Sequence, residues 1–169
     1  GKGEDVINLT STAKVVISGD KGDDTITVVG DTASKGATLL GGDGEDTIDT
    51  SANTTAGGKF TINGEAGEDV LTGSDASEVI SGGTDDDTIS GGNAGNKTFN
   101  GDAGDDKITL ISVNASTIDG GADDYDLTAD VLSTDTGKAH TISGGAGEDT
   151  ISVKGVQTGA LATNYKLDA

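Results

Sequence analysis

The chain has 169 residues, which is the size of a single domain. It carries 30 acidic residues against 10 lysines, and its formal net charge is −20. So acidic a surface excludes binding to nucleic acid, whose phosphates require basic residues. No apolar run reaches the roughly 18 residues of a membrane-spanning helix. The absence of cysteine excludes disulfides and thiol chemistry.

Only 31% of the residues are hydrophobic and 2% are aromatic, whereas glycine alone accounts for 29 residues. High charge with low hydrophobicity is typical of disordered chains. Here, however, the aliphatic residues recur at fixed offsets, a regularity that a disordered chain has no reason to keep. The pattern therefore predicts a repetitive fold whose negative charge is neutralised by something cationic.

A nine-residue loop recurs eight times. Residues 41–49 read GGDGEDTID, and residues 144–152 follow the same pattern, G-G-x-G-x-D-x-U-x, where U is a large aliphatic residue. The seventh copy, at residues 120–127, is aligned with one residue deleted, and the fifth has Asp85 in place of the position-four glycine. In chain order, position six holds Asp5, Asp24, Asp46, Asp69, Asp87, Asp106, the pair Asp123 and Asp124, and Asp149.

Short strands are predicted on both sides of each loop, with aliphatic residues inside and Thr or Ser outside. Successive loop aspartates are 18 to 25 residues apart, and two nonapeptides make 18, so each Asp loop marks one full coil. The aliphatic residues after the loops form one column: Ile7, Ile26, Ile48, Leu71, Ile89, Ile108, Leu127 and Ile151. Those before the loops form another: Ile17, Leu39, Ile62, Ile80, Phe99, Ile118 and Ile142.

The loops on the other side of each coil are degenerate. In loop 73–78, Glu78 takes the place of the key aspartate, and loop 91–97 keeps its glycines but has Asn96 instead. The others lack the motif and vary in length: 10–14, 29–36, 51–58, 112–116 and 129–138. One edge of the fold is therefore predicted to carry metal loops and the other to tolerate insertions.

The composition of the Asp loops suits calcium. Glycine adopts the positive φ angles of a sharp reversal, and Ca²⁺ takes six to eight oxygen ligands. Stacked coils lie about 4.8 Å apart, so an ion between two loops would receive carboxylate and carbonyl oxygens from both. Besides the aspartates, the expected site glycines are Gly19, Gly22, Gly41, Gly42, Gly44, Gly64, Gly67, Gly82, Gly83, Gly101, Gly104, Gly120, Gly121, Gly144, Gly145 and Gly147.

These loops resemble those of the RTX (repeats-in-toxin, haemolysin-type) calcium-binding family, and the resemblance covers nearly the whole chain. It implies an all-β fold, a right-handed parallel β-roll of about eight coils with calcium loops along one edge. Eight loops enclose about seven gaps, and about seven Ca²⁺ ions would offset much of the charge of −20. We expect one domain, residues 1–169, within a longer chain, because Gly1 lies inside a repeat.

The resemblance implies a structural function. The chain is similar to the RTX portions of bacterial S-layer proteins and surface adhesins. This implies type I secretion, an extracellular or cell-surface location, and folding and assembly on calcium binding. The expected partners are calcium ions and other copies or neighbouring domains of the same protein. The alternative is the carboxy-terminal RTX module of a secreted hydrolase or toxin, where motifs usually occupy both edges.

Three further expectations concern side chains that are not expected metal ligands. No nucleophile accompanies His140, the single histidine, so we expect no enzymatic activity and a packed position at the rim of the core. Lys97 lies two residues before the inward-facing Phe99, so its side chain is expected to start on the inner face of the strand, with its amino group reaching solvent through the edge. The acidic residues at position five of the loops are expected to face solvent.

Overall fold

The computed structural model describes residues 1–10, 14–29, 36–54, 59–112, 114–131, 140–155 and 165–168, and every regular element among them is a β-strand. The odd-numbered strands form one sheet: β1 (Val6–Leu9), β3 (Thr25–Val28), β5 (Thr47–Asp49), β7 (Val70–Thr72), β9 (Thr88–Gly91), β11 (Lys107–Ser112), β13 (Asp126–Val131) and β15 (Thr150–Gly155). The even-numbered strands form the other: β2 (Val15–Lys21), β4 (Ala37–Asp43), β6 (Lys59–Ala66), β8 (Ser77–Thr84), β10 (Lys97–Ala103), β12 (Ser116–Ala122), β14 (His140–Ser143) and β16 (Tyr165–Asp168).

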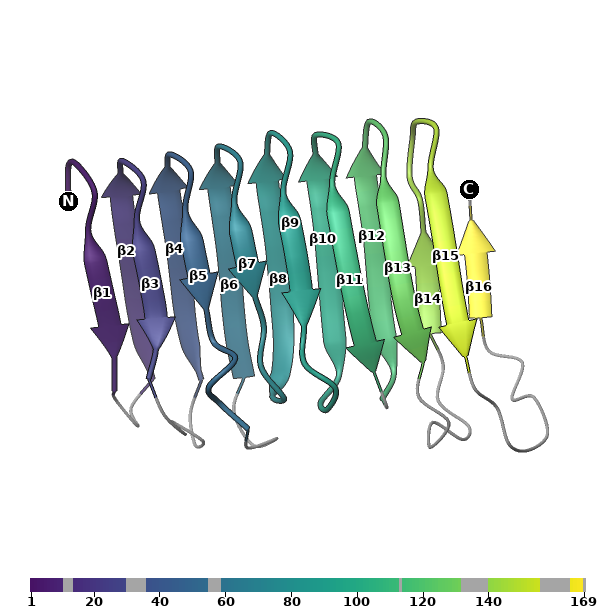
Figure 1. Cartoon of the computed structure of the whole chain (residues 1–169), viewed down its shortest axis with the longest axis horizontal. Coiled ribbons are helices and arrows are strands. Elements are labelled where there is room, and N and C mark those ends of the chain that lie inside the picture. The colour runs from purple at the N-terminus through teal and green to yellow at the C-terminus, as the bar shows by residue number, and fades with distance from the viewer. Residues whose placement is uncertain are drawn as a thin grey trace.

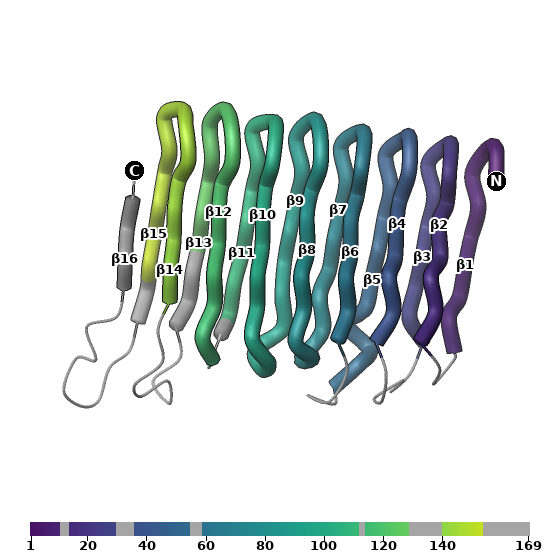
Figure 2. The backbone as a smooth tube through the Cα atoms, turned by 180° about the vertical axis from the view of Figure 1, so that it is seen from behind, coloured from purple at the N-terminus to yellow at the C-terminus, as the bar shows by residue number. Residues whose placement is uncertain are grey.

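Both eight-stranded sheets are parallel throughout, and each strand pairs with the strand of the same sheet in the next coil. The chain therefore alternates between the sheets and places one strand of every coil in each. Figure 1 shows the coils following one another along the long axis, and Figure 2 shows the same arrangement from behind. The predicted parallel β-roll is confirmed.

The strand register confirms both aliphatic columns. In the odd-numbered sheet, Ile7 pairs with Ile26 and the pairing continues coil by coil to Ile151. In the even-numbered sheet, the column that begins with Ile17 and Leu39 continues in the same way. The two columns meet between the sheets as one buried cluster. This narrow core holds each coil only through its stacked neighbours.

The turns between the sheets lie on two edges. We call the edge where each even-numbered strand turns into the next odd-numbered strand the Asp edge, because the nonapeptide loops lie there, at the top of Figure 1. The other is called the opposite edge. Its loops 73–78 and 91–97 are described in full. The remaining predicted loops there, at 10–14, 29–36, 51–58, 112–116 and 129–138, include positions outside the described residues.

Candidate calcium-binding edge

The position-six aspartates form a buried row along the Asp edge. Asp24, Asp46, Asp69, Asp87 and Asp106 are each at most 2% exposed. Oδ1 of each accepts a hydrogen bond from the backbone N–H of the position-six aspartate in the preceding coil, at 2.6–2.9 Å. Because the first of these donors is Asp5, the row spans six coils. Each carboxylate ties its own coil to the one before.

The second oxygen of these carboxylates has no partner. Oδ2 is buried and makes no hydrogen bond in Asp24, Asp46, Asp69, Asp87 and Asp106. Burying an ionised oxygen without compensation is costly, and such a group in a folded protein requires an explanation such as a bound ion. Five equivalent unpaired oxygens therefore indicate five equivalent places for a cation.

Glycine at position one leaves room beside that oxygen. A Cβ added to Gly41 would collide with Asp46 Oδ2 and would lie 2.6 Å from the carbonyl oxygen of Gly64 in the next coil. The same two neighbours, the carboxylate of the same loop and the next position-one carbonyl, surround Gly19, Gly64, Gly82 and Gly101. Carboxylate and carbonyl oxygens thus converge on one small space between consecutive coils. Oxygen donors of these two kinds are what Ca²⁺ binds.

Positions two and four supply the positive φ angles that turn each loop. In the third loop these are Gly42 and Gly44, with φ of 129° and 143°. The other predicted glycines at these positions also have positive φ: Gly22, Gly67, Gly83, Gly104, Gly121, Gly145 and Gly147. Where glycine is missing, an acidic residue takes the left-handed conformation, with φ of 74–82°: Asp20, Glu65, Asp85, Asp102 and Asp123. The loop geometry therefore persists even where its sequence does not.

Burial also governs the protonation of the row. It raises the pKa of Asp69 and of Asp87 to about 7 and that of Asp106 to about 6, and neighbouring carboxylates add to the rise. The hydrogen bond from the preceding N–H opposes this shift only in part. Burial raises the pKa of Asp46 as well. A divalent cation would compete with these protons and favour the ionised form.

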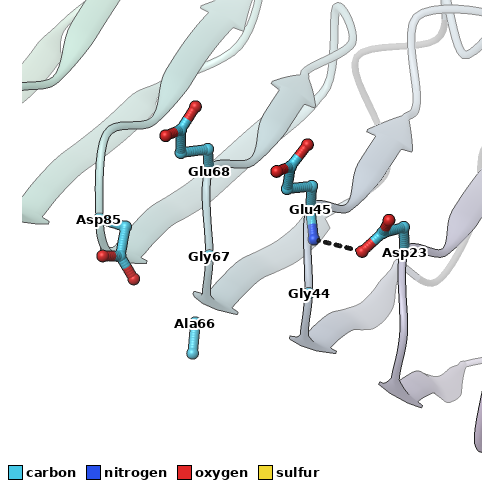
Figure 3. A pocket seen from close by; sticks show the side chains of 7 residues that line it. All are labelled: Asp23, Gly44, Glu45, Ala66, Gly67, Glu68 and Asp85. Atoms are coloured by element: carbon cyan, nitrogen blue, oxygen red, sulfur yellow. Dashed lines mark hydrogen bonds between the residues drawn. The ribbon is translucent and has the colours of Figure 1, made fainter.

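The position-five acids lie on the outer surface of the Asp edge, as predicted. Asp23, Glu45 and Glu68 are exposed and, together with Asp85, line an open depression across successive loops (Figure 3). The N–H of Glu45 donates to Asp23 Oδ1 at 3.0 Å (Figure 3). Further along, Asp86, Asp105 and Asp124 each accept the equivalent hydrogen bond from the backbone N–H of the position-five residue in the next coil. Because water reaches this outer ladder, the buried row is the better candidate for metal ligation.

Within the described part of the chain, no three His, Cys, Asp or Glu side chains converge on one point. The repeat explains this, because a gap between two coils receives one unpaired carboxylate oxygen from the row. The remaining ligands would have to be loop carbonyls, which Ca²⁺ accepts readily. The residues present therefore fit calcium bound largely by the backbone.

Comparison with known families gives a match over the same loops. The model of the RTX calcium-binding nonapeptide repeat matches residues 15–28, 38–53, 61–89, 72–108 and 141–153, which together are more than half of the chain. The chain belongs to the RTX family. RTX repeats bind calcium, and RTX repeat domains are typically non-catalytic. Neither the curated proteins nor the solved structures gave a match. Among the described residues, no helix is present that could cross a membrane.

The seventh RTX loop aligns without the predicted deletion. β10 and β12 pair Ala103 with Ala122, and this register puts Tyr125 at position six in place of an aspartate. The alignment of Asp123 and Asp124 with position six is therefore wrong, since they occupy positions four and five and are exposed. That alignment placed an aspartate at position six at the cost of the regular two-residue spacing to the aliphatic residue at position eight. None of the matched RTX segments includes residues 120–127.

Tyr125 interrupts the row. Its side chain is 3% exposed, its hydroxyl has no hydrogen-bond partner, and burial raises its pKa, so the phenol remains neutral. A Cβ on Gly120 would meet the Tyr125 ring, where the preceding loops offer a carboxylate. Asp149 follows the interruption and is only partly buried, and Gly144 lies beside its Oδ2. The uninterrupted series of candidate sites therefore ends at Asp106.

A buried ion pair on the opposite edge was not predicted. Lys97 Nζ lies 3.0 Å from Glu78 Oε2, and both side chains are fully buried. The expectation that the Lys97 amino group reaches solvent is therefore wrong. The two residues belong to an inward column that continues through Ser116 to His140, which is 3% exposed and thus packed as expected. The sequence did contain a signal for this pair. Glu78 and Lys97 each lie two residues before an inward-facing residue, so two opposite charges one coil apart would meet in the core.

Proposed function

We propose that this chain is a calcium-dependent structural β-roll of an exported bacterial surface protein, of the S-layer or adhesin kind. Its coils fold and assemble when calcium binds. The observation that carries the proposal is the buried row of five unpaired Oδ2 atoms. Without cations these carboxylates oppose the stacking of the coils, whereas bound cations convert them into links between coils. Folding and calcium binding are therefore coupled.

We infer five ions in place of the seven expected from the loop count alone. Each lies between an unpaired Oδ2 and the position-one carbonyl of the following coil, beside Asp24, Asp46, Asp69, Asp87 and Asp106. Asp5 is only partly buried, and Asp149 follows the interruption at Tyr125, so neither is counted. At ten times its dissociation constant, each ion stabilises the fold by about 1.4 kcal/mol. Five independent ions would give about 7 kcal/mol, which is comparable with the stability of a whole domain.

Two observations favour the proposed function, the first over a catalytic function and the second over the module of a secreted hydrolase or toxin. The acidic residues form ladders with nearly the same surroundings in each coil, whereas acid–base catalysis needs individual groups in distinct environments. The row of unpaired carboxylates occupies a single edge among the described loops. On the opposite edge, Glu78 holds position six of loop 73–78, and the strand register puts Lys97 at position six of loop 91–97, where the sequence had suggested Asn96. RTX modules of secreted hydrolases or toxins usually carry motifs on both edges, so this asymmetry supports the surface-protein function over that alternative.

Family membership also suggests where the protein works. An exported chain that leaves the cell by type I secretion would meet little free calcium inside and abundant calcium outside. The row of carboxylates would then remain unfilled until the chain is extracellular. The proposed partners are calcium ions and other copies or neighbouring domains of the same protein.

The test is circular dichroism of the chain in excess chelator and in millimolar calcium, followed by light scattering and electron microscopy. We expect the β signal to rise cooperatively with calcium and the loaded protein to self-associate. A full β spectrum in excess chelator would refute calcium-dependent folding. A loaded protein that remains monomeric at high concentration would instead favour the secreted hydrolase or toxin module.

A further inference from the structure

Lys97 Nζ lies in a cage of oxygens on the opposite edge. It donates hydrogen bonds to the carbonyl oxygens of Ser74 and Ala76, both at 2.5 Å, and to Glu78 Oε2 at 3.0 Å. The other carboxylate oxygen, Oε1, accepts bonds from the N–H and the hydroxyl of Ser74 at 2.6 and 2.7 Å and from Thr50 Oγ1 at 3.2 Å. The three donors of an ammonium group therefore meet three oxygens.

The cage has the frame of an RTX loop. Gly73 takes position one and Glu78 position six, and β8 and β10 pair Glu78 with Lys97, which is position six of the next coil. A Cβ on Gly73 would collide with Glu78 Oε2, as a Cβ on Gly41 would collide with Asp46 Oδ2. The carboxylate oxygen that receives the ammonium is therefore the counterpart of the oxygen left unpaired on the Asp edge.

We propose that the Lys97 ammonium is a built-in substitute for calcium on the opposite edge. On both edges, a position-six carboxylate and loop carbonyls surround a place for a cation. On the Asp edge that cation comes from solution, whereas on the opposite edge the next coil supplies it as a side chain. The loop 73–78 is therefore tied to β10 whether or not calcium is present.

This tie has a consequence for assembly of the roll. An isolated coil buries too little apolar surface to fold alone, so folding needs at least one stacked pair. The Glu78–Lys97 pair lies in the middle of the roll, with three strands on either side of β8 and β10 in the even-numbered sheet. It gives the calcium-free chain one pair of coils that stays in register, on which further coils can stack as calcium arrives.

Hydrogen exchange by NMR on the unmodified chain tests this directly, because one coil carries a reporter on each edge. The N–H of Asp69 bonds to Asp87 Oδ1 on the Asp edge, and the N–H of Glu78 bonds to the carbonyl of Asn96 on the opposite edge. On adding chelator, we expect exchange of the Asp69 N–H to accelerate at least about tenfold and that of Glu78 less than about twofold. Equal acceleration at both would overturn the proposal.

A second experiment asks whether the cage is a cation site. Lys97→Ala empties the cage but keeps its oxygens, and the control Lys97→Ala with Glu78→Gln also removes the carboxylate charge. Calorimetric titration with calcium should give one more ion for the single variant than for the unmodified chain, and no gain for the double variant. A folded single variant with unchanged stoichiometry would contradict the proposal. If the single variant does not fold in calcium, the exchange result decides alone. Both readouts are independent of the proposed surface function.

Discussion

Asp69 lies in the middle of the row, and two substitutions separate its two contributions. Its Oδ1 accepts the N–H of Asp46 at 2.7 Å, and its Oδ2 is unpaired in the space between Gly64 and the carbonyl of Gly82. Asp69→Asn keeps an acceptor for that N–H but removes the charge. Asp69→Ala removes the acceptor as well.

The expected magnitudes follow from these contacts. With free calcium at ten times the dissociation constant, loss of one ion lowers the free energy of unfolding by about 1.4 kcal/mol. Asp69→Ala also leaves the buried N–H of Asp46 unsatisfied, which costs about 1–3 kcal/mol more. In chelator, Asp69→Asn should have the opposite effect on stability, because the amide carries no buried charge and can donate to the carbonyl of Gly82. Calcium-free Asp69→Asn should therefore be more stable than the calcium-free unmodified chain.

The assay in calcium is urea unfolding followed by circular dichroism, with calorimetry for the number of ions. In chelator, the residual β signal of the variants is compared with that of the unmodified chain. Glu68→Gln is the matched control, because it removes the same charge from the adjacent exposed position. It should change the free energy of unfolding by less than about 0.5 kcal/mol and leave the stoichiometry unchanged. Equal effects of Asp69→Asn and Glu68→Gln, or a full set of ions in Asp69→Asn, would refute the assignment of the buried row.

Three other predictions follow from the same row. Tyr125→Asp restores a carboxylate beside the carbonyl of Gly144 and should add one bound ion by calorimetry, whereas Tyr125→Phe should add none. Gly41→Ala puts a methyl group against Asp46 Oδ2 and should reduce the number of bound ions by one. An unchanged number of ions by calorimetry would argue against a site between Asp46 Oδ2 and the carbonyl of Gly64. Burial raises the pKa of Asp69 and Asp87 from 3.8 to about 7, so their contribution to the stability of the calcium-free fold is full below about pH 4 and is lost as the pH rises through about 7. In chelator, the residual β signal by circular dichroism should therefore be stronger at pH 5 than at pH 8, and the reverse order would contradict this reasoning.

The sequence predicted the coil arrangement well because one spacing recurs. An inward residue at position eight must stack on its counterpart in the next coil, and the pairing from Ile7 to Ile151 follows that rule in every coil. The same rule, applied strictly to Leu127, would have identified Tyr125 as the position-six residue. The error came from weighing residue type above spacing, whereas stacking enforces spacing.

The opposite edge was harder to predict for a different reason. Its loops keep the frame but not the residues, so the motif gives no signal there. Whether Lys97 turns inward depends on a carboxylate one coil away, and Glu78 is 19 residues earlier in the chain. Only the register of β8 with β10 brings the two together. Unpaired Oδ2 atoms likewise become visible only when the hydrogen bonds between coils are known.

The most direct test of the calcium row is anomalous diffraction from crystals of the calcium-loaded protein. The structure predicts five peaks in a line along the Asp edge, each beside Oδ2 of one buried aspartate from Asp24 to Asp106, and none beside Tyr125. Peaks at the outer carboxylates of Asp23, Glu45 and Glu68, with the buried row left unoccupied, would contradict the account.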